Sequence, residues 1–351
     1  MWATLKELAR DTLGSSGYDV LAQLYWRLLS MVGAPFSGGN RLYWVNLVAF
    51  LAVAAIAYLI SRRRGFTLRG FLRHSFPGAV YLHKSAILDY KIYAMNALLA
   101  PTQLVFRSFG TATVATATAG SLAAMLGEDA ELTEPGVALL IAFTVFTAIV
   151  EDFASYAIHA LHHRVPILWE THKLHHSAEV LTPLTNFRIH PLYTIAQYAM
   201  GALFVGLLQG LFLHVFSLEA TLLTLFGVNV VTALFNLLSN LRHSHIWISF
   251  GPILSHIFVS PAQHQIHHSV APEHKDKNYG LVFAFWDWIF GTLYVPRQRE
   301  ELTFGLGDGQ PQPHTNLVSA YLGPIVGIWR HLRNGATALS NERGVNRTDI
   351  S

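Results

Sequence analysis

The sequence predicts an all-α integral membrane protein: a bundle of about four to five spanning helices with a helical cap that carries a histidine-rich dimetal site. Three observations lead to this prediction. Of the 351 residues, 52% are hydrophobic and 13% are charged, whereas a soluble domain carries about 25% charged residues. Apolar runs long enough to cross a bilayer recur along the chain. The 19 histidines gather in a few short segments.

Composition narrows the possible chemistry and partners. The chain has no cysteine, so any metal must be held by His, Asp or Glu. The formal charge of +3 comes from dispersed basic residues, which excludes the basic face that a nucleic-acid partner needs. The first 20 residues are mixed and polar. We expect them on the membrane surface or in water, without a secretory signal peptide.

The first apolar run, residues 44–60, is long enough to span and ends at the arginines of 62–64. A basic cluster directly after a span indicates the cytoplasmic side. The next run, 92–126, is interrupted by Pro101 and predicts either one kinked span or a short hairpin. The acidic segment 127–135 lacks Lys and Arg. It fits a non-cytoplasmic loop and favours a single crossing.

Three further apolar runs, 136–156, 195–216 and 220–238, predict additional spans. One histidine-rich region, 159–176, precedes the last two runs, and the other, 243–268, follows them. Two crossings return the chain to the same face. Both histidine regions are therefore expected on one side of the bilayer, the cytoplasmic side.

Three copies of the motif His-x-x-His-His begin at His159, His172 and His264. On a helix, positions i, i+3 and i+4 share one face, about 5–6 Å apart at Cβ. A strand would send i and i+3 to opposite faces. The motifs therefore predict helices that present histidine pairs to a shared metal site.

Nine imidazoles are too many for one tetrahedral zinc ion and suit two metal ions. Imidazole alone does not choose among zinc, iron, copper and nickel. Soluble di-iron bundles use Glu and Glu-x-x-His ligands, and the three motifs contain no glutamate. The soluble di-iron class is therefore disfavoured.

The segments 156–177 and 260–269, followed by Asn-Tyr-Gly at 278–280 and the aromatic stretch 286–292, resemble the fatty acid hydroxylase/sterol desaturase superfamily. The resemblance covers residues 136–296. It implies a helical membrane protein with a cytosol-facing, non-haem di-iron site that uses O₂ and two electrons to hydroxylate or desaturate lipids. By resemblance, the iron ligands are His159, His163, His172, His175, His176, His264, His267 and His268, with His243 as a further ligand.

Two features depart from the family pattern. Ala160 follows His159 where many members have arginine. His162 occupies a position that varies in the family, and we expect it beside the ligands or at the surface. We expect the chain to comprise an N-terminal region with the first span and a basic cytoplasmic segment (1–91), a membrane-embedded catalytic domain similar to the fatty acid hydroxylases (92–296) and a polar tail (297–351).

The expected reaction selects the metal. An unactivated C–H bond requires a redox-active centre, and zinc has no redox chemistry, so iron is expected. Hydroxylation is slightly preferred, since desaturation needs two C–H bonds presented in sequence. An acyl chain, a sterol or hopanoid, a carotenoid and an ether lipid all remain possible substrates. No haem-binding segment is evident, so electrons are expected from a separate ferredoxin or cytochrome b5 type protein.

Metal-bound histidines normally donate their second N–H to a carboxylate or a carbonyl. Asp152 lies seven residues before His159, on the same helical face, and is a candidate to orient that ring or a ring of the second motif. Three further residues are candidates to support the ligands: His190, His245 and Asp287.

Two other classes of protein could use such histidines. A membrane metal transporter or storage protein would place its site near the bilayer midplane, whereas these motifs follow the ends of predicted spans. A zinc hydrolase would usually carry His-Glu-x-x-His, which the sequence lacks. Both observations favour the oxidoreductase.

Overall fold

The fold, obtained as a computed structural model, is described for residues 33–37, 40–61, 66–127, 136–216 and 222–345, except positions 223, 226, 227, 238, 308 and 310. In these ranges the only strands are β1 (Thr224–Leu225) and β2 (Val228–Asn229), which form a small antiparallel hairpin. All other regular structure is helical, which confirms the all-α prediction. The expectations for residues 1–32, the arginines 62–64 and the acidic loop 128–135 lie outside the described residues.

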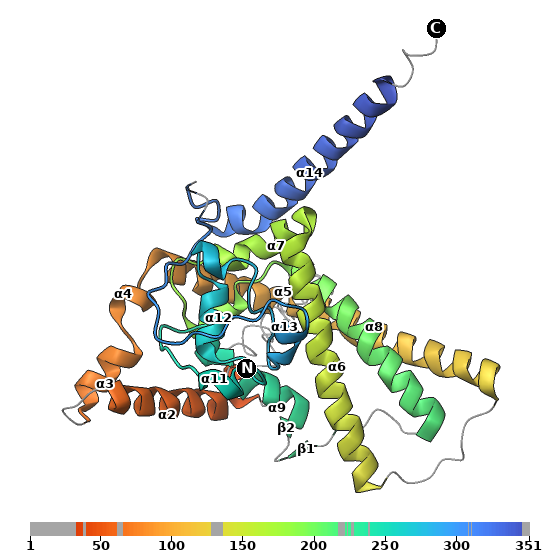
Figure 1. The fold of residues 1–351 in the computed structure, drawn as a ribbon, viewed down its shortest axis with the longest axis horizontal. Coiled ribbons are helices and arrows are strands. Elements are labelled where there is room, and N and C mark those ends of the chain that lie inside the picture. Colours follow the sequence, from red (N-terminus) through yellow and green to blue (C-terminus); the bar gives the residue numbers. More distant parts are fainter. Residues whose placement is uncertain are drawn as a thin grey trace, which may run out of the picture.

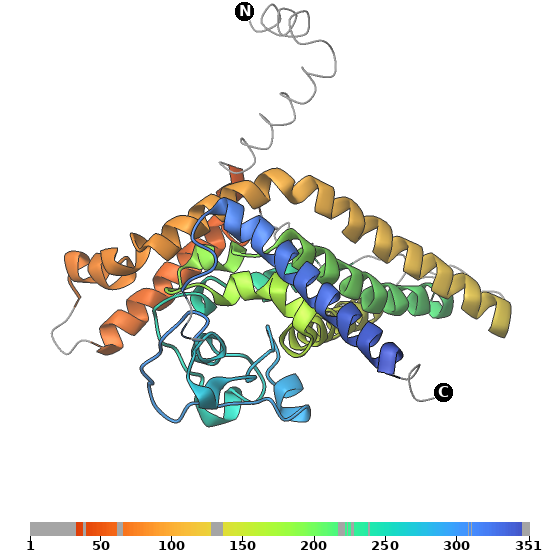
Figure 2. The ribbon, with the colours of Figure 1, turned by 90° about the horizontal axis from the view of Figure 1, so that it is seen from above.

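Three long helices form the bundle: α5 (Lys84–Leu126), α6 (Val137–Arg164) and α8 (Pro191–Phe216). Helices α5 and α8 lie side by side (Figure 2). Gly206 and Gly210 lie directly against Val114 and Thr118 of α5. Small residues four apart let two helix backbones approach closely, as in membrane helix pairs.

Helices α6 and α8 are long and apolar enough to cross a membrane, and α2 (Trp44–Ser61) contains a shorter apolar segment. The stretch 92–126, for which one span and a hairpin were both possible, belongs to the single 43-residue helix α5. The helix continues through Pro101. The hairpin alternative is therefore excluded.

The predicted span at 220–238 is wrong. Its described part contains the β1–β2 hairpin and the eight-residue helix α9 (Val230–Leu237). Eight residues make a helix about 12 Å long, too short for a hydrocarbon core of about 30 Å. The Asn229 side chain accepts the backbone N–H of Thr232. This N-cap starts α9 afresh and separates it from the preceding segment.

Shorter elements build the cap around the end of α6 that carries histidines (Figure 1). The first half of α14 packs there as well, since Ala320 joins Leu174, Leu88 and Ile92 in one core cluster. The remaining part of α14 projects away from the body. The elements not yet given are η1 (Ala34–Phe36), α3 (Leu68–Ser75), α4 (Gly78–Tyr81), α7 (Pro166–His176), η2 (Pro183–Phe187), α10 (Ser239–Arg242), α11 (Gly251–Leu254), α12 (Pro261–His267), η3 (Pro272–His274), α13 (Phe285–Ile289) and α14 (Leu317–Val345).

Candidate metal centre

All three histidine motifs lie on helices, as their spacing predicts. The first occupies the C-terminal turns of α6, and the second the C-terminal turns of α7. Val165 ends α6 and precedes α7, whose first residue is Pro166. Proline is tolerated in the first turn of a helix but cannot continue one. The chain therefore turns sharply between the first two motifs and brings them face to face.

The third motif sits on α12, a helix of only seven residues. So short a helix is unstable alone, and a capping box stabilises its start. The Ser260 hydroxyl accepts the backbone N–H of Gln263, while the Gln263 side-chain oxygen accepts the backbone N–H of Ser260. The cap fixes the direction in which His264 and His267 point.

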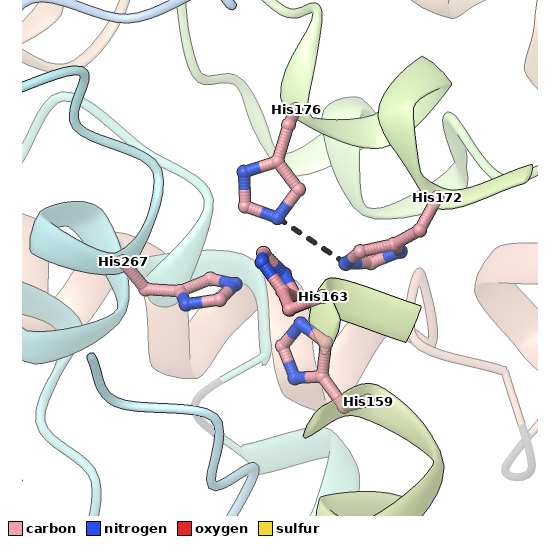
Figure 3. A group of neighbouring side chains, drawn as sticks. All are labelled: His159, His163, His172, His176 and His267. Carbon is pink, nitrogen blue, oxygen red and sulfur yellow. Dashed lines mark hydrogen bonds between the residues drawn. The ribbon is translucent and has the colours of Figure 1, made fainter. Parts of the chain in front are cut away.

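The histidines gather in two groups, each with its candidate ligand nitrogens within 4.8 Å of one another. We call them site A and site B. Figure 3 shows the rings of site A pointing toward one another from α6, α7 and α12. Site A comprises His159, His163, His172, His176 and His267, and site B comprises His175, His243, His264 and His268.

The two sites adjoin. The ring of His176 in site A stacks on that of His268 in site B, with centroids 4.6 Å apart. The His172 and His175 rings are 5.3 Å apart. Together the two sites contain all nine histidines that the sequence singled out as ligands. The successive helices α6 and α7, the residue that follows α10, and the more distant α12 therefore place two candidate metal sites next to each other.

Backbone carbonyls orient rings from two of the motifs. Nδ1 of His159 lies 2.8 Å from the Tyr279 oxygen, and Nδ1 of His267 lies 2.8 Å from the Lys277 oxygen. A carbonyl can only accept, so each Nδ1 carries the proton. Each Nε2 then presents its lone pair to site A. The loop 277–279 thus fixes the tautomer of two candidate ligands.

Several ring nitrogens are buried without a hydrogen-bond partner among the described residues. In sites A and B they include Nε2 of His159, His163, His267 and His268. A buried unpaired polar atom is costly, and a metal ion would satisfy these atoms. Other Nε2 atoms face each other closely, for example His243 and His264 at 3.0 Å. The donor set therefore fits a pair of metal ions.

Burial also keeps the imidazoles neutral. Burial, with a smaller contribution from neighbouring imidazoles, lowers the pKa of His175 to about 3 and that of His267 to about 4. Burial likewise holds the pKa of His264 well below its ordinary value. Metal ligation requires the neutral ring. Within the described residues, neither site includes a carboxylate, so any bound metal would have an all-imidazole protein shell.

Asp287 supports the loop and touches no site ring. Its carboxylate accepts the backbone N–H groups of Tyr279 and Gly280, both at 2.8 Å. Asn278, in the left-handed region at φ 57°, donates its amide N–H to the Gln263 carbonyl on α12. The Asn-Tyr-Gly motif thus couples the third histidine motif to the ring of His159.

Asp152 does not orient the His159 ring, which corrects the expectation from the sequence. Its carboxylate accepts the backbone N–H groups of Val282 and Phe283 at 2.9 and 3.0 Å. Two helical turns separate Asp152 from His159 by about 11 Å, beyond the reach of the side chain. The nearer donors come from the loop that folds back against α6.

His190 and His245 also lie apart from both sites. Nε2 of His190 is 3.0 Å from the Tyr321 carbonyl and links the start of α8 to α14. Nε2 of His245 is 2.6 Å from the His74 carbonyl. Within the described residues, neither histidine makes a ring contact or a hydrogen bond with a candidate ligand, so neither supports the sites directly.

His162 is buried rather than at the surface, with Nδ1 donating to the Ile158 carbonyl at 2.7 Å. Its ring packs on Tyr193, which stacks on His172 with centroids 4.7 Å apart. His162 belongs to neither site. It packs beside site A.

Arg188, which was not among the residues selected from the sequence, holds the second motif in place. Arg188 is completely buried and donates to the Leu174 carbonyl, the Ser177 hydroxyl and the Asp89 carboxylate, each at 2.8 Å. The available signal was a charged residue in a largely apolar stretch, two positions before His190.

Comparison with known proteins agrees with this geometry. Residues 144–292 match the family model "Fatty acid hydroxylase". An ornithine lipid hydroxylase of Rhizobium tropici is 29% identical over 46% of this chain and 45% of its own length. The alkylglycerol monooxygenase of Homo sapiens is 31% identical over 44% of this chain and 31% of its own length. A Delta(7)-sterol 5(6)-desaturase of Gibberella zeae is 30% identical over 44% of this chain and 38% of its own length.

The chain thus spans less than half the length of these curated relatives, and no solved structure matches it. The matched residues 144–292 contain all three histidine motifs and the loop that orients their rings. Residues 144–292 of the chain are therefore similar to the fatty acid hydroxylase family.

Proposed function

We propose that this chain is a membrane-bound, non-haem di-iron oxidoreductase that hydroxylates or desaturates a C–H bond of a lipid. It would use O₂ and electrons from a separate redox protein. The observation that carries the proposal is the convergence of nine buried imidazoles in two adjoining groups. The relatives support it, since their names are those of a lipid hydroxylase, a monooxygenase and a desaturase.

In this proposal site A and site B each hold one iron ion through the histidines given above. Iron is proposed over zinc because oxidation of an unactivated C–H bond needs a redox metal. When bound, the two irons would supply the activation of O₂. Hydroxylation is preferred over desaturation, because desaturation requires two C–H bonds to be presented in sequence.

The chain's own residues orient and shield this centre. The Tyr279 and Lys277 carbonyls hold protons at Nδ1 of His159 and His267, so that Nε2 of both rings faces the metal. The candidate ligands are almost all buried, which limits the access of water. Exclusion of water strengthens the electrostatic interactions within a site and suppresses side reactions.

The proposed membrane arrangement is a multi-pass protein of about four spans with its active site on the cytoplasmic side. The long apolar helices α6 and α8 support it. A ferredoxin or a cytochrome b5 type protein is proposed as electron donor. The catalytic domain is proposed to occupy residues 92–296, which include the family match. Sites A and B lie at the end of α6, which favours catalysis over transport through the midplane.

Metal analysis of the purified chain tests the proposal. We expect two iron ions per chain, loss of iron and of lipid oxidation in His172→Ala (site A) and in His268→Ala (site B), and unchanged membrane insertion. His162→Ala is the matched control, because His162 is a buried histidine of the same motif that belongs to neither site. Full iron content and turnover in both site variants would contradict the assignment.

Lipid analysis of cells with and without the gene would identify the substrate. Oxygen consumption that depends on the lipid is expected. Metal flux without oxygen consumption would instead favour a transporter.

A further inference from the structure

Helix α3 lies at the end of the proposed span α2 and is fixed to it (Figure 1). The ring of Phe71 packs on that of Tyr58 in α2, with centroids 6.2 Å apart. The hydroxyl of Thr67, which caps α3, lies 3.3 Å from the Tyr58 hydroxyl. A Cβ on Gly70 would collide with the same hydroxyl, so a glycine is what allows the two helices to meet this closely. The last turn of α2 therefore sets the position of α3.

The outward face of α2 is suited to lipid. One face of the helix is buried, and Phe50 and Ala54 there pack in a core cluster with Leu241. The opposite face exposes large apolar side chains, among them Val48 and Ile56. An apolar helix with such a face is stable against acyl chains rather than water. In the proposed membrane arrangement, α3 therefore lies where α2 leaves the hydrocarbon layer.

Helix α3 has an apolar flank beside a basic flank. Leu68 and Leu72, one turn apart, are 65% and 47% exposed. Arg69 and Arg73 each follow one of these leucines and form a parallel row along the helix. Exposed leucines next to arginines on a short helix are typical of the boundary between lipid headgroups and acyl chains.

A surface cavity of about 360 Å³ opens at the basic flank. It is lined by Thr67, Arg69, Gly70, Arg73 and His74, and no carboxylate is among these lining residues. Neither guanidinium has an ion-pair or hydrogen-bond partner within the part of the chain that the structure describes.

The positive charge of the cavity is not balanced by nearby acidic residues in the sequence. The segment 20–88 contains no Asp or Glu, and the arginines at 62–64 directly precede α3. A cluster of arginines next to a span attracts anionic lipid headgroups. The cavity therefore presents uncompensated positive charge at the place where such headgroups are expected.

We propose that the cavity at α3 binds the phosphate of an anionic phospholipid. Arg69 and Arg73, one turn apart, hold the phosphate, because guanidinium forks pair with phosphate oxygens. Leu68 and Leu72 contact the acyl chains of the same lipid. The quaternary ammonium of a zwitterionic headgroup would offset the charge of its phosphate, so an anionic lipid is preferred. This site lies outside residues 144–292, and it rests on the proposed membrane arrangement but not on the proposed reaction.

Equilibrium binding to the purified, iron-loaded chain in non-ionic detergent tests this inference. The probes are two radiolabelled lipids with identical acyl chains, dioleoyl phosphatidylglycerol and dioleoyl phosphatidylcholine. We expect the wild-type chain to bind phosphatidylglycerol more tightly. Each of Arg69→Gln and Arg73→Gln should weaken that binding about five-fold, the contribution of one basic residue at an anionic membrane surface, and leave phosphatidylcholine unchanged. Raising the salt from about 0.1 M to about 1 M should reduce the preference, because the Debye length falls from about 10 Å to about 3 Å.

Arg297→Gln is the matched control. It removes the same charge from an exposed arginine that does not line the cavity, and it should leave both dissociation constants unchanged. Leu68→Gln and Leu72→Gln test the apolar flank, and each should weaken both lipids alike, because the two lipids share their acyl chains. All of these side chains are exposed, so the variants should fold, and an unchanged iron content would verify this.

The inference is overturned if the wild-type chain binds both lipids equally, or if both arginine variants keep its preference for phosphatidylglycerol. Inorganic phosphate at the same concentration as the lipid should not compete, and equal competition would assign the cavity to free phosphate instead. If the arginine variants lose binding of an acidic ferredoxin but keep that of phosphatidylglycerol, the cavity is a docking site for an acidic protein and not for a lipid.

These outcomes are separable from a failure of the proposed function. A chain that loads iron and oxidises a lipid, but whose arginine variants bind both probes as the wild type does, retains the function and loses this inference. A chain whose preference for phosphatidylglycerol depends on Arg69 and Arg73, yet which oxidises no lipid in the presence of iron, O₂ and reductant, retains the inference and loses the function.

Discussion

Removing the guanidinium of Arg188 should destabilise the chain and loosen the second histidine motif. Arg188 and Asp89 form an ion pair at 2.8 Å with both residues 0% exposed. Arg188→Met leaves the carboxylate buried without its charged partner, although the Thr185 hydroxyl still donates to it. Breaking a buried pair in this way costs roughly 3–5 kcal/mol.

The contacts of Arg188 also explain an effect on metal binding. Its guanidinium reaches the Leu174 carbonyl and the Ser177 hydroxyl at the end of α7, and it joins them to the start of α5 through Asp89. Leu174 lies between His172 and His175, which belong to different sites. Loss of the anchor should therefore reduce iron content at both sites. Arg188→Lys should give an intermediate result, because one ammonium cannot reproduce the guanidinium fork.

Equilibrium unfolding in mixed detergent micelles, with iron content measured in parallel, checks this prediction. The double variant Arg188→Met with Asp89→Leu removes both charges. It should recover most of the lost stability, since apolar replacement of a complete buried pair is often neutral. The coupling energy in the double-mutant cycle should then be at least about 2 kcal/mol. A single variant within about 1 kcal/mol of wild type, or a double variant no more stable than Arg188→Met, would refute the reasoning.

Three further predictions follow from the site and the fold. Gly280→Ala should lower iron content, because the new Cβ would lie 2.7 Å from the Phe283 carbonyl oxygen and displace the loop that orients His159. Gly120→Ala, at an open position, is its control and should retain iron. Chelation of iron should lower the melting temperature, since a ligand at about 100 times its Kd stabilises by about 2.7 kcal/mol. Restoring Fe²⁺ should reverse the change, and an unchanged melting curve after verified iron removal would contradict it. His314→Gln should reduce the loss of stability in acid. Burial lowers the pKa of His314 from 6.5 to about 4, so below pH 6.5 the unfolded chain takes up a proton that the folded chain excludes until about pH 4. Stability from this group is complete above pH 6.5 and falls by about 2 kcal/mol at pH 5. Unfolding at pH 7 and pH 5 should show a smaller difference for the variant, and equal differences would count against this assignment.

Local pattern was sufficient for much of the fold and for the identity of the candidate ligands. The i, i+3, i+4 spacing of the histidine motifs predicts helices, and all three motifs are helical. Sustained apolar composition predicts the long helices α6 and α8. The nine histidines selected by motif and resemblance are those that the structure gathers in sites A and B. These features depend on residues close together in sequence, which is why the sequence alone reveals them.

The apolar composition of residues 220–238 predicted a membrane span, and this prediction is wrong. Average composition carries no information about a single capping contact. Here the Asn229 side chain caps a new helix and so interrupts the predicted span. Conversely, Pro101 suggested an interruption, yet α5 is continuous and packs along α8. In both places a single contact or a neighbouring helix outweighed the local preference.

Only the tertiary structure decided which groups support the candidate ligands. Sequence separation placed Asp152 beside His159, whereas the fold gives that ring the Tyr279 carbonyl, 120 residues away, and gives Asp152 the N–H groups of Val282 and Phe283. Any residue can supply a backbone carbonyl or N–H, so these groups leave no signature in the residue types. Their positions are determined by how the loop after α12 folds back on α6, and that path depends on contacts between distant parts of the chain.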